Sequence, residues 1–188
     1  MAKLVCSMLT PAAIAIFGVY IHRVTKRFED RQWRGQKLTE KRLAIYDDLA
    51  PLFNDLLCYF SYVGCWKDMK PQDVVALKRK IDRKIYLAAP LFPREFFQAC
   101  QAFQGLCFKP FNGWGMDAQL RTNWGRRKEA DAGWLDEWER YYTADNAVSD
   151  PAKVKAAYDQ VMQEFADSIG VTADHSHVVM GMLPYNIR

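Results

Sequence analysis

Residues 4–21 read LVCSMLTPAAIAIFGVYI, which is 18 residues without a formal charge. As an α-helix this segment would be about 27 Å long at roughly 1.5 Å per residue, close to the roughly 30 Å of a bilayer's hydrocarbon core. Pro11 weakens the run, but a proline inside a membrane helix is tolerated where neighbouring groups satisfy the freed carbonyl. The segment therefore predicts a single N-terminal transmembrane helix, with residues 1–22 as the anchor.

The flank that follows this segment is rich in Lys and Arg, whereas the N-terminal flank carries only Lys3 and the α-amine. Five of these cations, which we call the basic collar, are expected to contact lipid headgroups: Arg23, Lys26, Arg27, Arg31 and Arg34. The positive-inside rule places the more basic flank, and the chain after it, in the cytoplasm. The expected location is the bacterial inner membrane, crossed once, with the N-terminus outside and the C-terminal body in the cytoplasm.

Two other interpretations of residues 4–21 remain open. A secretory signal peptide needs a small-residue cleavage site after its apolar core, and the residues found there, 22–27, read HRVTKR. A buried core helix of a soluble protein would also lack charges. The length of the segment and its stop-transfer flank favour the membrane anchor.

The rest of the chain has the pattern of a helical body. Behind a basic juxtamembrane segment (23–36) we expect a helical cytoplasmic domain over 37–170 and a C-terminal tail over 171–188. Apolar residues recur at helical spacing in four stretches, which lie within 37–63, 71–88, 93–107 and 151–169. Pro51 is expected to kink or divide the first, and Gly35 to form a hinge before it, although one continuous helix is the alternative.

The predicted fold class is all-α, with a single N-terminal transmembrane helix followed by a bundle of about five helices. A short helix starting at Asp117 and a helix with an aromatic face around Trp138 complete the bundle. No segment has sustained period-two alternation, so we expect no sheet. The five cysteines form no CxxC pair and are expected to be small buried apolar residues, with Cys100 and Cys107 on one helix face.

The distribution of charge limits the class of partner. The net charge is +4; residues 22–42 carry eight cations and three carboxylates, or +5, and Lys3 adds +1, so the remainder sums to −2. Basic character confined to the juxtamembrane segment argues for lipid as a partner and against direct nucleic-acid binding. Five cations on one helix are expected to form a solvated face with carboxylate neighbours, or else a second basic surface: Lys78, Arg79, Lys80, Arg83 and Lys84.

The sequence lacks the common catalytic and cofactor motifs. It contains neither G-x-S-x-G nor the phosphate-binding GxxxxGK[ST]. His175 and His177 alone make a poor metal site, because zinc needs three or four ligands. We therefore expect no catalytic residue, no metal and no cofactor, and a protein that is not an enzyme.

The stretch from Gly113 to Lys128 is the candidate binding region. Arg and Trp are favoured at buried interface positions and at anion sites, and the candidate residues are Trp114, Asp117, Arg121, Trp124, Arg126 and Arg127. The alternative is a capping loop in which the two tryptophans fill the end of the bundle and Asp117 pairs with Arg121 at i, i+4.

The functional expectation is a membrane-anchored, non-enzymatic interaction or scaffold protein that binds membrane lipid through residues 4–21 and the basic collar. We also expect a homo-oligomer or a protein partner; Ala12, Ala15 and Gly18 offer a small-residue face for contact between membrane helices. Two alternatives remain open. One is a membrane-perturbing toxin or defence effector held in check by a partner or ligand, and the other is a membrane-tethered enzyme without a recognisable motif.

Overall fold

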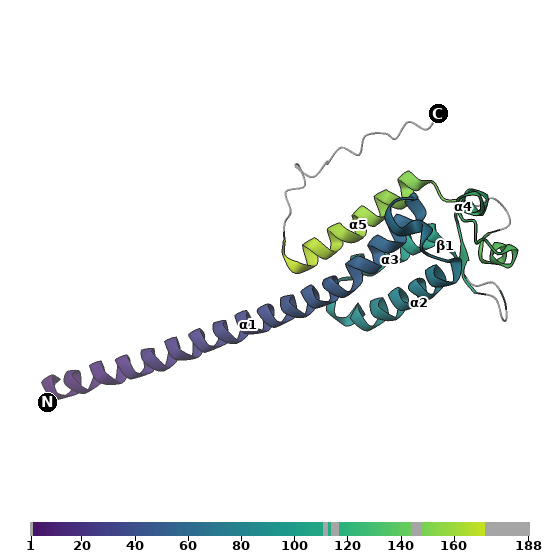
Figure 1. Cartoon of the computed structure of the whole chain (residues 1–188). Helices are drawn as coiled ribbons and strands as arrows, with labels where there is room; N and C mark the ends of the chain where they lie inside the picture. Colours follow the sequence, from purple (N-terminus) through teal and green to yellow (C-terminus); the bar gives the residue numbers. More distant parts are fainter. Residues whose placement is uncertain (1, 111–112, 114–116, 144–147, 172–188) are drawn as a thin grey trace. The chain divides into compact units, whose positions relative to one another are not determined.

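The computed structural model describes the backbone of residues 2–110, 113, 117–143 and 148–171, and the side chains of these ranges from residue 17 onward. The chain forms two units, Met1–Lys41 and Arg42–Arg188. Its class is all-α, as the sequence predicts: the described residues form five α-helices, three short 3-10 helices and one two-stranded sheet (Figure 1). The predicted tail, with His175 and His177, lies outside the described residues.

Helix α1 spans Ala2–Ser61 without interruption, so each unit contains part of it. Gly35 and Pro51 both lie inside the helix, so the prediction of a hinge or division is wrong and the continuous-helix alternative is confirmed. Pro51 removes one backbone hydrogen bond, but Leu49 and Phe53 on either side of it are fully buried, and this packing holds the helix. The helix ends at Ser61, and the next residue, Tyr62, has a left-handed φ of 56°.

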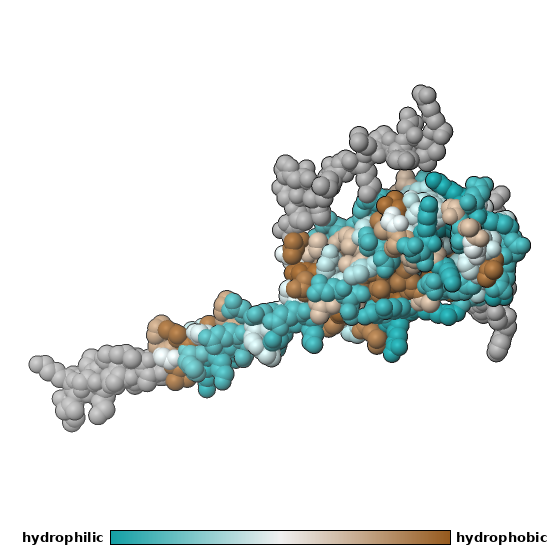
Figure 2. All heavy atoms as spheres, viewed as in Figure 1, coloured by the Kyte–Doolittle hydropathy of each residue, from teal (hydrophilic) through white to brown (hydrophobic). Residues whose placement is uncertain are grey.

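In the first unit, every described side chain of α1 from Phe17 to Lys41 is exposed. Figure 2 shows apolar residues next to the grey N-terminal atoms and hydrophilic ones further along. Within the part of the chain that the structure describes, no helix is long and apolar enough to cross a membrane. Most side chains of the predicted span, residues 4–21, lie outside the described ones.

In the second unit, the C-terminal part of α1 packs with α2 (Pro71–Ala88), α3 (Arg94–Cys107) and α5 (Pro151–Ile169) around one apolar core. Phe165 of α5 is fully buried at its centre. The Phe165 ring centroid lies 5.3 Å from that of Tyr46, 6.5 Å from Phe53 and 4.5 Å from Phe96. The periodic apolar residues of the four predicted stretches thus meet in one place, which confirms the predicted bundle.

The ends of α2 and α5 follow local sequence signals. Pro71 occupies the first turn of α2, and the Lys70 N–H donates to Asp73 Oδ2 at 3.2 Å. At α5 the Asp150 side chain accepts from the Ala152 N–H at 2.9 Å. Gly170 then ends the helix with a φ of 82°, a conformation that glycine adopts without a steric penalty. These boundaries agree with the predicted ones.

The region between α3 and α5 differs from the prediction. Strands β1 (Phe108–Lys109) and β2 (Gln119–Leu120) pair antiparallel where we expected no sheet and a helix starting at Asp117. Strands of two residues are too short to show period-two alternation, so the sequence pattern did not reveal them. Helix α4 (Trp124–Ala130) follows, and the expected aromatic helix is the 3-10 helix η3, Asp136–Tyr141. Two further 3-10 helices, η1 (Gly64–Lys67) and η2 (Ala89–Leu91), flank α2.

The cysteines divide into two groups. Cys100 and Cys107 are fully buried in α3, as predicted from their shared face. Burial raises the pKa of the Cys100 thiol to about 12 and also raises that of Cys107, so both stay neutral. Cys65 is exposed and Cys58 half-buried, so the expectation of burial is wrong for Cys65.

Candidate functional site

The structure describes five of the six predicted site residues and places them on α4 or beside β2. Trp124, Arg126 and Arg127 lie on α4, whose first turn is capped by Asn123: its Oδ1 accepts from the Arg126 N–H at 3.4 Å. Asp117 and Arg121 flank β2, and the Arg121 N–H donates to the Cys107 carbonyl at 2.9 Å. Trp114 lies outside the described residues.

Arg127 is the buried member of the group, with 4% of its surface exposed. Its Nη2 donates to the Tyr59 carbonyl at 2.6 Å and to Thr122 Oγ1 at 3.3 Å. Its Cζ lies 3.5 Å from the ring centroid of Tyr59, 4.6 Å from that of Tyr62 and 5.5 Å from that of Trp66. The guanidinium therefore joins α4 to the end of α1 by hydrogen bonds and cation–π contacts.

No carboxylate among the described residues forms an ion pair with Arg127. Its Nε and Nη1 are buried and have no hydrogen-bond partner in that part of the chain. A buried charge with incomplete pairing is costly unless polar or charged neighbours compensate it. The residues that the structure describes therefore compensate the buried charge of Arg127 only in part.

The neighbouring arginines have different surroundings. Arg126 is exposed on the adjacent helical face, with its Cζ 4.5 Å from the Tyr62 ring centroid. Arg121 is half-buried, and its Nε also lacks a partner in the described part of the chain. Trp124 stacks on Trp134 with ring centroids 6.5 Å apart. The structure thus brings Trp124 and Arg127 toward one aromatic cluster and leaves Arg126 in solvent.

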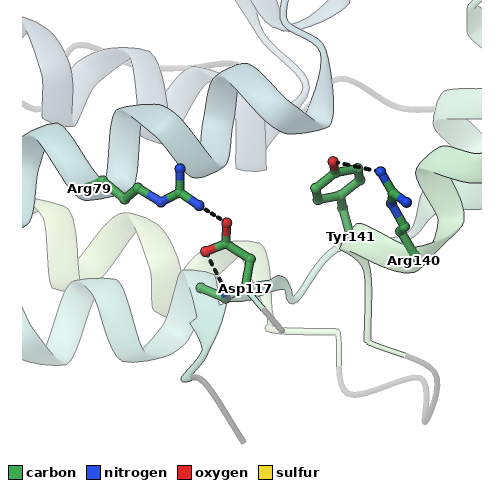
Figure 3. Close-up of polar contacts among 5 residues, drawn as sticks. Arg79, Asp117, Arg140 and Tyr141 are labelled. Atoms are coloured by element: carbon green, nitrogen blue, oxygen red, sulfur yellow. Dashed lines mark hydrogen bonds and ion pairs between the residues drawn. The ribbon is translucent and has the colours of Figure 1, made fainter. Parts of the chain in front are cut away.

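Asp117 does not pair with Arg121, as the capping-loop alternative required. Its carboxylate forms an ion pair with Arg79 of α2, and its Oδ1 accepts from the Ala118 N–H at 2.9 Å (Figure 3). The strand conformation of Gln119–Leu120 explains this, because the i, i+4 contact needs a helix between the two residues.

Three of the five cations of α2 form ion pairs with carboxylates. Lys78 pairs with Asp82 at 2.6 Å and Lys84 with Asp48 of α1 at 2.6 Å, in addition to the Arg79–Asp117 pair. This arrangement agrees with a solvated face with carboxylate neighbours.

A small cavity lies beside Arg127, with a volume of about 20 Å³ for the centres of water-sized groups. Because this volume counts only the positions of group centres, the cavity has room for a water or for a small polar group. Its walls are aromatic side chains from three parts of the chain, Tyr59, Trp66, Trp134, Trp138 and Tyr142, and its charged members are Lys67, Arg127 and Asp131.

The polar groups of this cavity are mostly donors. The Trp134 Nε1–H is buried without a partner among the described residues, like Arg127 Nε and Nη1. Tyr59 and Tyr142 share one hydrogen bond between their hydroxyl oxygens at 2.7 Å. Burial raises the pKa of Tyr59, although Arg127 opposes this, and burial and Tyr59 together raise that of Tyr142. Both hydroxyls are therefore neutral at pH 7 and do not offset the charge of Arg127.

This arrangement suits the binding of a small hydrogen-bond acceptor. Sequence reasoning identified Arg127 but missed the groups around it, because Tyr59, Trp66 and Asp131 come from segments that show no local binding pattern. Among the described residues no group of three His, Cys, Asp or Glu side chains could hold a metal ion. Comparisons with protein-family models, with curated proteins and with solved structures found no match to this chain.

Proposed function

We propose that this protein is a membrane-anchored, non-enzymatic interaction protein, whose N-terminal helix inserts into a bilayer and holds the helical body at the cytoplasmic face. The observation that carries the proposal is the surface of α1 between Phe17 and Lys41, where every side chain is exposed. Large apolar side chains come first, with Phe17 and Tyr20 each 64% exposed, and cations follow from Arg23 onward.

Exposed apolar side chains in such number mark a surface with a partner. Burying them in lipid would recover about 25 cal/mol for each Å² of apolar surface removed from water. Lipid is the partner that matches the order of residues, because the uncharged run of residues 4–21 leads directly into the basic collar. Anionic headgroups attract each nearby cation by about 1 kcal/mol.

Helix geometry predicts unequal roles within the collar. With Ile21 at the edge of the hydrocarbon core, Arg23 and Arg27 would lie about 3 and 9 Å further along the helix axis, and Arg34 about 20 Å, at roughly 1.5 Å per residue. The headgroup layer is about 5–8 Å thick, and electrostatic attraction decays over about 8 Å at physiological salt. Arg23, Lys26 and Arg27 should therefore contribute most.

The anchor is tested by alkaline carbonate extraction of the full-length chain from membranes. We expect the wild type to stay with the membrane and the double variant Ile14→Lys, Ile16→Lys to be released, because each charge at a helix centre opposes insertion by roughly 2.5–3.5 kcal/mol. Release of the wild type by carbonate would show that the chain does not span the bilayer, and would overturn this proposal.

The collar is tested by insertion into vesicles with and without anionic lipid. Changing all five collar cations to Gln should abolish the preference for anionic vesicles. The matched control changes five exposed body cations that form no ion pair among the described residues: Lys70, Lys80, Arg83, Arg94 and Lys153. Equal losses in both variants would mean that net charge, and not the collar, governs the preference.

A further inference from the structure

We propose that the cavity beside Arg127 binds the carboxylate group of a compact organic acid. The site lies entirely in the helical body and is independent of the membrane anchor. Three observations support it: a cavity of limited size, buried donors without acceptors in the described part of the chain, and an excess of positive charge in its walls.

The donors define the chemistry of the ligand. Arg127 Nε and Nη1 and Trp134 Nε1 present N–H groups that no described residue accepts. An ionised carboxylate has two oxygens that act only as acceptors, so one such group can receive several of these hydrogen bonds. Hydrogen bonds between a guanidinium and a carboxylate are also stronger than those between neutral groups.

The charges of the walls favour an anion over a neutral acceptor. Among the described residues that line the cavity, Lys67 and Arg127 are cationic and Asp131 is the one carboxylate. Asp131 Oδ1 accepts from the Gly133 N–H at 2.8 Å, and Asp131 forms no ion pair with Arg127. Asp131 weakens the attraction for an anion without neutralising Arg127.

The size of the cavity limits the ligand. The space open to the centres of water-sized groups is about 20 Å³. A planar carboxylate group is smaller than a tetrahedral phosphate, which has four oxygens around its centre, so the limited space favours the carboxylate. Lys67 and Ala130 are exposed residues of the lining, so a substituent on the acid would extend toward solvent on that side. The aromatic side chains on the other sides would shield part of the ion pair from water and so strengthen it.

The test is a titration of the detergent-solubilised full-length protein with acetate, followed by tryptophan fluorescence, since Trp66, Trp134 and Trp138 line the cavity. We expect a saturable change with a Kd of about 1 mM, a value within the range for a ligand of four heavy atoms. Acetamide, the neutral analogue, and chloride at equal ionic strength should give no saturable change. Equal responses to chloride and acetate would overturn the proposal, and so would no response, which would leave Arg127 a structural clamp beside ordinary water.

Variants separate binding from folding. Arg127→Gln should weaken acetate binding by about tenfold or more. If this variant does not fold, Trp134→Phe keeps most of the ring and removes one donor, and should weaken binding about threefold or more. Asp131→Asn should strengthen binding, because it removes the opposing charge while its Oδ1 can still accept from Gly133.

The matched control is Arg140→Gln. Arg140 also lies against a tyrosine, with its Cζ 5.1 Å from the Tyr141 ring centroid, but it is exposed and does not line the cavity (Figure 3). Its loss should leave the Kd unchanged. If Arg140→Gln and Arg127→Gln weaken acetate binding equally, binding follows net charge and the site assignment is wrong.

Discussion

Helix α1 contains one phenylalanine at position 28 that is 67% exposed and another at position 53 that is fully buried. Both lie in the same uninterrupted helix, Ala2–Ser61. Phe53 packs against Phe103 of α3, with ring centroids 5.7 Å apart, and against Phe165 of α5. Phe28 has no aromatic contact among the described residues.

The apolar pattern is similar in the two parts of this helix. Phe17, Ile21, Val24 and Phe28 recur at steps of four, three and four residues, as do Ile45, Leu49, Leu52 and Leu56. Such spacing forms one apolar stripe along a helix. The body covers the stripe that runs from Ile45 to Leu56, whereas the stripe that runs from Phe17 to Phe28 is exposed. A pattern of this kind therefore predicts a helix that needs a partner, but it does not identify the partner.

The largest expected difference between the two parts concerns stability. Phe53→Ala should lower the free energy of unfolding of the body by about 3–5 kcal/mol, because it leaves a cavity between α1, α3 and α5. Phe28→Ala, the matched control, should change it by less than about 0.5 kcal/mol. Urea unfolding of the detergent-solubilised chain, followed by tryptophan fluorescence, measures both. A large loss with Phe28→Ala would show that the first part of α1 is also packed in the folded protein.

Two arginines of α1, Arg42 and Arg27, should differ in their effect on stability by an intermediate amount. Arg42 donates from Nε to the Leu91 carbonyl and from Nη1 to the Ser168 carbonyl, each at 2.6 Å. Arg42→Ala should cost about 1.5–3 kcal/mol of stability, because it removes charged hydrogen bonds to two partly buried carbonyls. Arg27→Ala should leave stability unchanged and reduce the preference for anionic vesicles instead.

The same two variants provide their own control. Each is expected to alter one property, stability for Arg42 and lipid preference for Arg27, so the two measurements are made on both. Loss of lipid preference in Arg42→Ala without loss of stability would place Arg42 in the basic surface and contradict its assignment to the body.

The parts of this fold that sequence predicted are those governed by neighbouring residues. The start of α2 at Pro71 and the ends of α5 at Asp150 and Gly170 follow from capping chemistry within a few residues. The buried face of α3 follows from helical spacing. Strands β1 and β2 could not be predicted in this way, because their pairing depends on contacts between segments that are too short to show a period.

The candidate site could be predicted only in part for a similar reason. Arg126 and Arg127 are equivalent in a sequence reading, yet successive residues on a helix point about 100° apart, so one faces solvent and the other the core. The partner that distinguishes them is Tyr59, which lies 68 residues earlier. Burial, missing acceptors and the adjacent cavity arise from this long-range contact.

The smallest expected difference in the free energy of unfolding is between variants of two tyrosines of α1. Tyr59 shares a buried hydrogen bond with Tyr142 at 2.7 Å, whereas Tyr20 is exposed. Tyr59→Phe should lower the free energy of unfolding by about 0.5–1.5 kcal/mol at pH 7, and Tyr20→Phe should leave it unchanged. Urea unfolding of both variants and the wild type checks this, and equal effects would remove the distinction between the two parts of α1.

The pH dependence of stability gives a second test of the burial of Tyr59. Burial raises the pKa of Tyr59 above its ordinary value of 10.0, so the unfolded chain loses this proton first as the pH rises. The stability contributed by neutral Tyr59 is therefore complete below pH 10 and is lost above it, by at most about 1.4 kcal/mol per pH unit. Tyr59→Phe should make the fall in stability above pH 10 shallower, with the remainder due in part to Tyr142. Parallel curves for the variant and the wild type would mean that Tyr59 ionises as readily in the folded protein as in the unfolded chain, and that its end of α1 is open to water.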